Sequence, residues 1–386
     1  MTKITPLPTT LESVTVSRFV SPSSLGADPA CFLRFQGREL DGSRIAGLLE
    51  SPRAILGQVV HKAIEMADGH SNLIDVFDSL LDTRNEQLLT DSRRAHLAPL
   101  QVSVGNGPWQ TARRVLTSRV GPLAPFSLAQ QRTSEPTGAT DYRQSEHEAF
   151  LSSDTLGLRG LADLIRHHPD GSITVTDWKI GAVTTEEGHI KLEYRLQLAA
   201  YLLLVREKWP DRKIKTHLFN GEVFDVEITE ADLSQVRARV DLVRSALTDM
   251  EAVAARQLAT VSANCTSCEI RHRCPVYVKT LTQSGRFSPV ETPGRGRDVV
   301  GELRSFKPRP DGGIANIGLP DGSLVQLRGL SERFDLSSHE GEHLACFGFT
   351  PSPRSHRQTG APLLANTYFE TGANSRAWQA EIFRLE

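Results

Sequence analysis

The amino-acid sequence predicts an α/β domain with a central mixed sheet flanked by helices, followed by a smaller all-β domain. Three observations support this prediction. A strand, a tight turn and a second strand lie within residues 156–180. Segments with helical periodicity precede and follow them, and from about residue 286 short strands alternate with turn signals. The change in texture predicts domains of residues 1–284 and 285–386.

The composition and charge are those of an ordinary globular protein. Of the 386 residues, 39% are hydrophobic and 23% are charged, and the formal net charge is −2. This charge excludes a protein that coats DNA with its whole surface, so contact with nucleic acid requires a local basic groove. No apolar run reaches the length of a membrane span, and the N-terminal MTKITPLPTT lacks the layout of a signal peptide. We therefore expect a cytoplasmic protein without a membrane contact.

A helix over residues 52–68 carries the first candidate residue. Its apolar side chains recur at helical spacing in two adjoining stripes, so most of the helix is expected to be buried. Gly57, His61 and Glu65 follow one another at steps of four and project to one side. A lone histidine on an apolar helix is ordinarily a core residue. His61 therefore becomes a candidate metal ligand only if carboxylates meet it.

The strand–turn–strand segment carries the strongest candidate site. Pro169-Asp170-Gly171 separates LGLRGLADLIRHH from SITVTDWKI, and a three-residue loop there places Asp163 opposite Asp177. Lys179, two residues further on, shares the face of Asp177. Two carboxylates beside a lysine are suited to metal-assisted cleavage of a phosphodiester. The alternative is an ordinary ion pair on a solvent-facing strand.

The helix after this hairpin carries two further candidates. It spans residues 194–209, and Gln197 and Tyr201 lie four residues apart on one face. The alternative is that both are ordinary residues at the edge of the core. Other expected elements are a strand at residues 146–151, from which Glu146 and Glu148 can approach the site, two short strands within residues 214–228, and a helix over residues 230–258.

The five cysteines do not form a disulfide framework in a reducing compartment. Cys265, Cys268 and Cys274 form a C-x2-C-x5-C run that is followed by proline, and Cys31 lies far upstream. Four thiolates can hold zinc or an iron–sulfur cluster. Cys346 is left over and is expected to be a small buried hydrophobic residue.

The elements GQVVHKAIE, GLADLI, VTDWKIG and QLAAY, bracketed by Cys31 and CTSCEIRHRCP, together resemble the RecB-like branch of the PD-(D/E)XK nuclease superfamily. More narrowly, they resemble its iron–sulfur members, the AddB-type repair nucleases and the CRISPR adaptation exonucleases. The resemblance covers about residues 15–280 and is specific because separate elements occur in the right order. It implies a restriction-endonuclease-like core with a central mixed sheet.

The resemblance also implies a catalytic metal site. His61, Asp163 and Asp177 match the ligands of a divalent cation, Mg2+ or Mn2+, which activates water for attack on phosphorus. Lys179 matches the lysine of the family's name motif, and the acidic residue of that motif is an aspartate in this chain.

Two further sets of residues follow from the same resemblance. Gln197 and Tyr201 match the helix motif that lines the active-site groove near the DNA. Cys31, Cys265, Cys268 and Cys274 match the ligands of a 4Fe-4S cluster, with zinc as the less favoured occupant. Either metal would join the two ends of the nuclease domain, so a structural role is expected.

We therefore expect a metal-dependent deoxyribonuclease, an exonuclease on single strands or duplex ends, that serves DNA repair, recombination or defence against foreign DNA. The sequence contains no Walker-type glycine-rich loop, so unwinding would require a separate helicase or another protein subunit. The alternatives are a catalytically silent DNA-binding or assembly subunit and an iron–sulfur redox sensor.

The five short strands after residue 286 predict a small OB-like barrel, with an SH3-like barrel as the alternative. OB folds bind single strands through basic grooves and stacking aromatic residues. The alternative is a module that docks on protein. The basic and aromatic candidates are Arg304, Phe306, Lys307, Arg309, Arg354 and Arg357.

Overall fold

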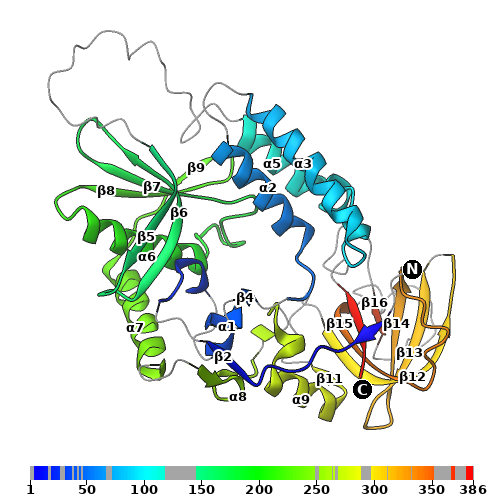
Figure 1. The fold of residues 1–386 in the computed structure, drawn as a ribbon. Coiled ribbons are helices and arrows are strands. Elements are labelled where there is room, and N and C mark those ends of the chain that lie inside the picture. Colours follow the sequence, from blue (N-terminus) through cyan, green and yellow to red (C-terminus); the bar gives the residue numbers. More distant parts are fainter. Residues whose placement is uncertain are drawn as a thin grey trace.

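The computed structural model describes most of the chain in two β-rich parts (Figure 1). The described residues are 4–15, 19–26, 31–36, 39–40, 43–44, 47–66, 72–117, 145–247, 252–262, 264–265, 268–287, 297–310, 312–331, 333–351, 367–369 and 380–385. Among them, no helix is long and apolar enough to cross a lipid bilayer.

The first part is built on a five-stranded mixed sheet in the order β5-β6-β7-β8-β9. The strands β7 and β8 run parallel, and the other three pairs are antiparallel. The predicted α/β class with a mixed sheet flanked by helices is therefore confirmed. The strands are β5 (Ser145–Ser153), β6 (Leu158–His167), β7 (Ile173–Trp178), β8 (Ile214–Phe219) and β9 (Val223–Asp225).

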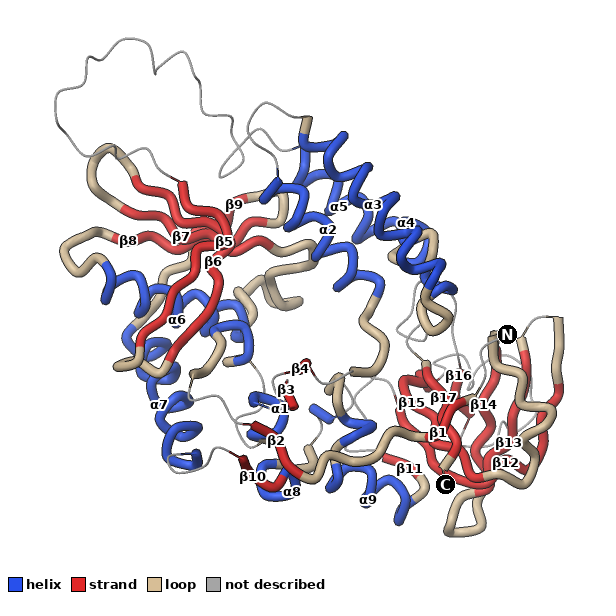
Figure 2. The backbone as a smooth tube through the Cα atoms, in the orientation of Figure 1, coloured by secondary structure: helices blue, strands red, loops and turns tan. Residues whose placement is uncertain are grey.

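Helices cover both faces of this sheet, as Figures 1 and 2 show. On one face Val175 of β7 packs in a core with α6 and α7. On the other face Leu164 and Trp178 pack in a separate core with α2, α3 and α5. The helices are α2 (Pro52–Met66), α3 (Leu73–Thr90), α4 (Leu100–Ser103), α5 (Asn106–Thr117), α6 (Leu192–Lys208) and α7 (Glu230–Leu247).

The predicted register of the hairpin β6–β7 is confirmed. The backbone N–H of His168 donates to the carbonyl oxygen of Ser172 at 2.9 Å, and Gly171 takes the left-handed φ of 79° that the loop requires. Leu164 pairs with Thr176, so the next step of the register sets Asp163 against Asp177.

The expected helix over residues 230–258 is wrong in its last part. The helix α7 ends at Leu247, and β10 (Ala252–Ala254) pairs antiparallel with β2 (Ser13–Thr15) before the short helix α8 (Ala255–Leu258). Alanine favours a helix, but the backbone of these residues pairs with β2 and is therefore extended. Nearby lie α1 (Phe32–Gln36), β3 (Glu39–Leu40), β4 (Ser43–Arg44) and α9 (Pro275–Ser284).

The second part is an eight-stranded sheet in the order β1-β17-β15-β16-β14-β13-β12-β11, with an additional pairing between β12 and β15. Its outermost strand is N-terminal, because Thr5–Pro6 pairs in parallel with β17. The basic candidates Arg354 and Arg357 lie outside the described residues. The strands are β1 (Thr5–Pro6), β11 (Arg286–Phe287), β12 (Arg297–Lys307), β13 (Gly313–Gly318), β14 (Leu324–Leu330), β15 (His343–Pro351), β16 (Thr367–Phe369) and β17 (Glu381–Arg384).

A buried carboxylate joins this sheet to the cysteine-bearing segment. Asp298 of β12 is fully buried and accepts hydrogen bonds from Arg271 Nε at 2.6 Å, Arg271 Nη2 at 3.1 Å and the Tyr277 hydroxyl at 2.6 Å. The backbone N–H of Gly348 in β15 donates to the same carboxylate at 2.8 Å. Four donors compensate for the loss of water around a buried charge.

Removing this carboxylate should strongly destabilise the protein. We expect Asp298→Ala to lower the free energy of unfolding by about 3–5 kcal/mol, because it leaves the buried Arg271 charge unpaired. Urea unfolding measures the change. The matched control is Glu302→Ala on the same strand, which breaks a partly exposed pair with Arg304 and should cost less than about 1 kcal/mol. Equal unfolding midpoints for the two variants would contradict this account.

Candidate functional site

The acidic residues of the hairpin lie where β6 and β7 meet. Asp163 is 8% exposed, and its Oδ2 accepts a hydrogen bond from the backbone N–H of Trp178 at 2.6 Å. This bond fixes one oxygen of the carboxylate and leaves Oδ1 for other partners. The site therefore begins with a carboxylate that the hairpin backbone itself orients.

Asp177, Lys179 and Gln197 form a closed set of contacts beside it. Lys179 Nζ lies 2.6 Å from Asp177 Oδ2 and donates to Gln197 Oε1 at 3.1 Å. Gln197 Nε2, from α6, donates to Asp177 Oδ1 at 2.8 Å. Each polar group in the set thus compensates another that is shielded from water. Burial raises the pKa of Asp177, and the charge of Lys179 opposes that rise.

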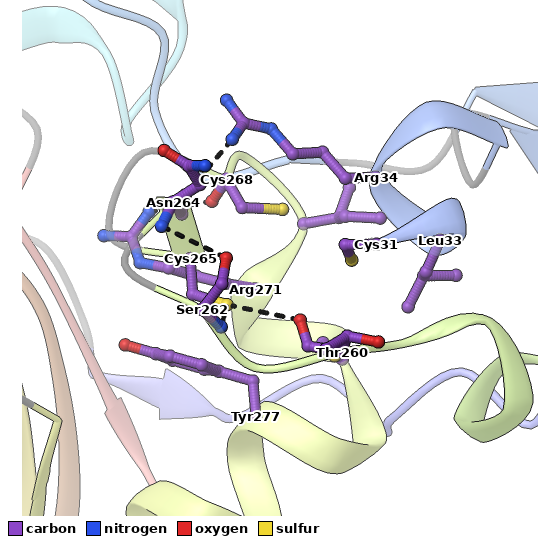
Figure 3. Close-up of a pocket in the computed structure, with 12 residues that line it drawn as sticks. Cys31, Leu33, Arg34, Thr260, Ser262, Asn264, Cys265, Cys268, Arg271 and Tyr277 are labelled. Carbon is purple, nitrogen blue, oxygen red and sulfur yellow. Dashed lines mark hydrogen bonds between the residues drawn. The ribbon is translucent and has the colours of Figure 1, made fainter. Parts of the chain in front are cut away.

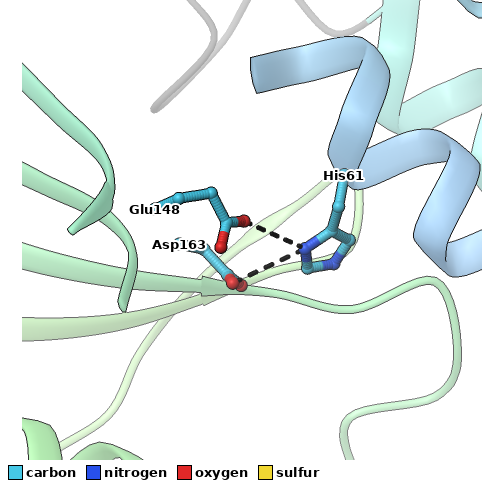
Figure 4. Close-up of side chains that lie close together, drawn as sticks. All are labelled: His61, Glu148 and Asp163. Carbon is cyan, nitrogen blue, oxygen red and sulfur yellow. Dashed lines mark ion pairs between the residues drawn. The ribbon is translucent and has the colours of Figure 1, made fainter. Parts of the chain in front are cut away.

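His61 of α2 reaches the same place from the other face of the sheet. Its Nδ1 lies 3.5 Å from Asp163 Oδ1 and 3.8 Å from Glu148 Oε1 (Figure 4). Ligand atoms of these three residues lie within 4.8 Å of one another. Two carboxylates and one imidazole suit Mg2+ or Mn2+. Asp177 is outside this group, because its carboxylate is held by Lys179 and Gln197.

Glu148 is the ligand candidate that sequence reasoning specified least. The sequence suggested Glu146 and Glu148 together, but Glu146 pairs with His167 at 3.0 Å and Lys208 at 3.6 Å. Glu148 has a φ of 46°, and among the described residues no other non-glycine residue has a positive φ. Such a conformation costs about 1–3 kcal/mol and is found at functional sites. An outlier of this kind has no signature in the sequence.

Tyr201 is placed differently from Gln197 although both lie on α6. Its hydroxyl donates to the carbonyl oxygen of Leu161 in β6. The residue is 4% exposed, and burial raises the pKa of its hydroxyl. Tyr201 therefore holds β6 against α6 two residues before Asp163, whereas Gln197 contacts Asp177 and Lys179 directly.

The four predicted cysteine ligands line a single pocket. Figure 3 shows Cys31, Cys265 and Cys268 turned toward it, with Arg34 and Arg271 at its rim. Cys274 also lines this pocket, whereas Cys346 lies in the core of the C-terminal sheet. Cys31 is far from the other three cysteines in sequence but lies beside them in the folded protein.

Three of the thiols in this pocket, those of Cys265, Cys268 and Cys274, are buried. Burial raises the pKa of Cys268 to about 11 and that of Cys274 to about 12, so these thiols become thiolates only when a metal replaces their protons.

His61 should remain protonated in the metal-free protein well above neutral pH. Burial opposes the charge, but the carboxylates of Asp163 and Glu148 outweigh it and raise the pKa of His61 to about 10. The ion pairs of His61 therefore contribute their full stabilisation of the folded state below about pH 6.5. This stabilisation is lost as the pH rises through about 10. NMR titration of the imidazoles tests this, with His147, whose pKa burial lowers, as the internal control. Titration of His61 near 6.5 would contradict the arrangement.

Comparison with known proteins agrees with this geometry. A family model described as the PD-(D/E)XK nuclease superfamily matches residues 20–275. The matched range contains the acidic hairpin, His61, Glu148 and the four cysteines of the pocket. A search of curated proteins finds no match. Membership of this superfamily implies a nuclease that acts on DNA with divalent metal ions. The chain belongs to the PD-(D/E)XK nuclease superfamily.

Proposed function

We propose that this protein is a Mg2+- or Mn2+-dependent deoxyribonuclease that degrades single strands or duplex ends as an exonuclease. One observation carries the proposal: four separate elements bring His61, Glu148, Asp163, Asp177 and Lys179 to one place. Each of these residues is a metal ligand or a cation that can contact phosphate. Superfamily membership supports the same chemistry.

The proposed roles follow from the contacts. His61, Glu148 and Asp163 hold the metal, because their ligand atoms already lie within 4.8 Å of one another. Asp177, which Lys179 and Gln197 hold beside this group in the metal-free protein, completes the ligand set when the metal binds. A bound divalent cation would lower the pKa of a coordinated water and neutralise charge on the phosphate. Lys179 stabilises the negative charge of the scissile phosphate, and Gln197 keeps Lys179 and Asp177 in position. Tyr201 positions the acidic residues through its hydrogen bond to β6.

We also propose that Cys31, Cys265, Cys268 and Cys274 hold a 4Fe-4S cluster, which would make the protein a RecB-like iron–sulfur nuclease. The proposal is supported by the four cysteines, three local and one distant in sequence, that line one pocket and can act as the four ligands of a cluster. Arg34 at the pocket supplies positive charge for the thiolates, whereas the charge of Arg271 is paired with Asp298. Because Cys31 is far from the other ligands in sequence, the cluster would close a very long loop and stabilise the fold.

For residues 285–386 we propose an OB-like domain appended to a nuclease domain of residues 1–284. The pairings β12–β13, β13–β14, β14–β16, β16–β15 and β15–β12 support this reading, because they follow one another in a cycle. Such a domain binds single strands or docks on a partner such as a separate helicase. We further propose that the nuclease acts in the cytoplasm, in DNA repair, recombination or defence against foreign DNA.

The chemistry is tested by two substitutions with different effects on metal binding. Asp177→Ala should abolish cleavage and weaken Mn2+ binding, because a ligand is lost. Lys179→Ala should lower kcat by at least about 100-fold and leave Mn2+ binding intact. Cleavage of labelled single-stranded and duplex DNA and titration calorimetry with Mn2+ measure the two effects.

The matched control is Lys215→Ala, which removes an exposed lysine from β8 and should leave both properties unchanged. Wild-type cleavage by both site variants would show that the hairpin is not the active site. A wild-type protein that binds DNA but never cleaves it with any divalent metal would instead favour a silent binding subunit.

The cluster is tested on the protein as purified without oxygen. We expect a brown protein with broad absorption at about 400 nm and about four irons and four sulfides per chain. Cys265→Ala should lose the colour and unfold at lower temperature. Cys346→Ala is the matched control, because this buried cysteine lies away from the pocket, and it should keep the colour. A colourless protein with one zinc per chain would overturn the cluster.

A further inference from the structure

Two large apolar side chains are exposed beside the acidic site. Phe150 of β5 is 61% exposed and Leu161 of β6 is 50% exposed. The register pairs them directly opposite each other. Phe150 follows Glu148 by two residues, and Leu161 precedes Asp163 by two residues. The pair therefore forms an apolar step immediately next to the acidic group, and we call Phe150 and Leu161 the apolar step.

The apolar step is on the side of the hairpin from which His61 approaches. Ala149, Leu151 and Ala162, which alternate with the exposed pair, are buried in the core that contains α6. Side chains of neighbouring strand residues point to opposite faces, so Phe150 and Leu161 point away from α6. The helix α2 packs with the other face of the sheet and carries His61.

An exposed arginine continues the same surface. Arg159 is opposite Ser152 in the register, two positions beyond the pair Phe150 and Leu161, and its Nε donates to Ser152 Oγ at 3.3 Å. Its guanidinium carbon lies 3.7 Å from the centre of the Phe19 ring and 6.0 Å from that of Phe150. The Arg159 side chain is exposed to solvent, so its charge can be reached by an anion.

We propose that the apolar step stacks a nucleobase of single-stranded DNA beside the acidic site. Arg159 binds a phosphate of the same DNA strand. Bases stack on exposed aromatic rings only when they are not paired, so this surface selects a single strand over an intact duplex. Arginine stacked on Phe19 offers a preorganised guanidinium to the phosphate. The inference rests on the proposed nuclease function and specifies its substrate.

The experiment measures DNA affinity in the Lys179→Ala background, where cleavage does not interfere. A labelled single-stranded oligonucleotide carries one abasic position that is moved along its length. At one position the missing base should weaken binding by about 5- to 100-fold. With Phe150→Ala added, every oligonucleotide should bind as weakly as the most affected abasic one did before. The affinity should then no longer depend on where the abasic position lies. Phe150→Trp should restore the sensitive position.

Arg159→Ala should weaken single-strand binding and reduce the slope of log affinity against log salt by about 0.7, the effect of one phosphate contact. Matched controls are Leu89→Ala, which removes a side chain that is 63% exposed on α3, and Arg237→Ala on α7. Both should bind as the background protein does. Duplex affinity should not change with Phe150→Ala.

The outcomes separate the two proposals. Single-strand binding that is unchanged by Phe150→Ala, or an equal loss for duplex DNA, would overturn the apolar step and leave the nuclease function standing. A background protein with no affinity for any DNA would overturn the proposed function itself. Loss of binding with Leu89→Ala as large as with Phe150→Ala would show a general surface effect and would also overturn the apolar step.

Discussion

The burial of strand β7 is the constraint on which the site depends. All six of its residues are buried, its two edges pair with β6 and β8, and its faces are covered by the cores of α6 and α2. The same two helices deliver Gln197 and His61 to the end of the strand. Asp177 is 2% exposed there, so it requires the Lys179 and Gln197 contacts to compensate for lost water. Packing and active-site chemistry thus use the same elements.

A buried ion pair also connects the cysteine-bearing segment to the C-terminal sheet. Arg271 lines the cysteine pocket, and its guanidinium pairs with the buried Asp298 of β12. One hydrophobic core includes Cys265, Cys268 and Cys274 together with apolar residues of β12, β15 and β17. A change in the pocket therefore acts on the packing of the C-terminal sheet. The two parts are joined by buried contacts as well as by the chain.

Local chemistry explains which predictions succeeded. The hairpin register followed from Gly171 and from strand alternation, both of which act within a few residues. The helix over residues 230–258 was wrong at Ala252–Ala254, where a pairing with Ser13–Thr15 outweighs the helix propensity of alanine. Glu148 approaches His61 and has a positive φ that no sequence pattern signals, whereas Glu146 pairs with His167. Each miss involves a partner distant in sequence or an unusual backbone conformation.

By itself, the sequence determined the α/β class, the acidic hairpin with Asp163 opposite Asp177, and the set of cysteines to be brought together. Periodicity, turn residues and motif order carry that information because they reflect short-range backbone preferences. Only the tertiary structure decided that Glu148 meets His61, that Asp298 neutralises Arg271, and that Phe150 is exposed opposite Leu161. These facts depend on how separate elements pack, and packing is set by contacts between residues far apart in the chain.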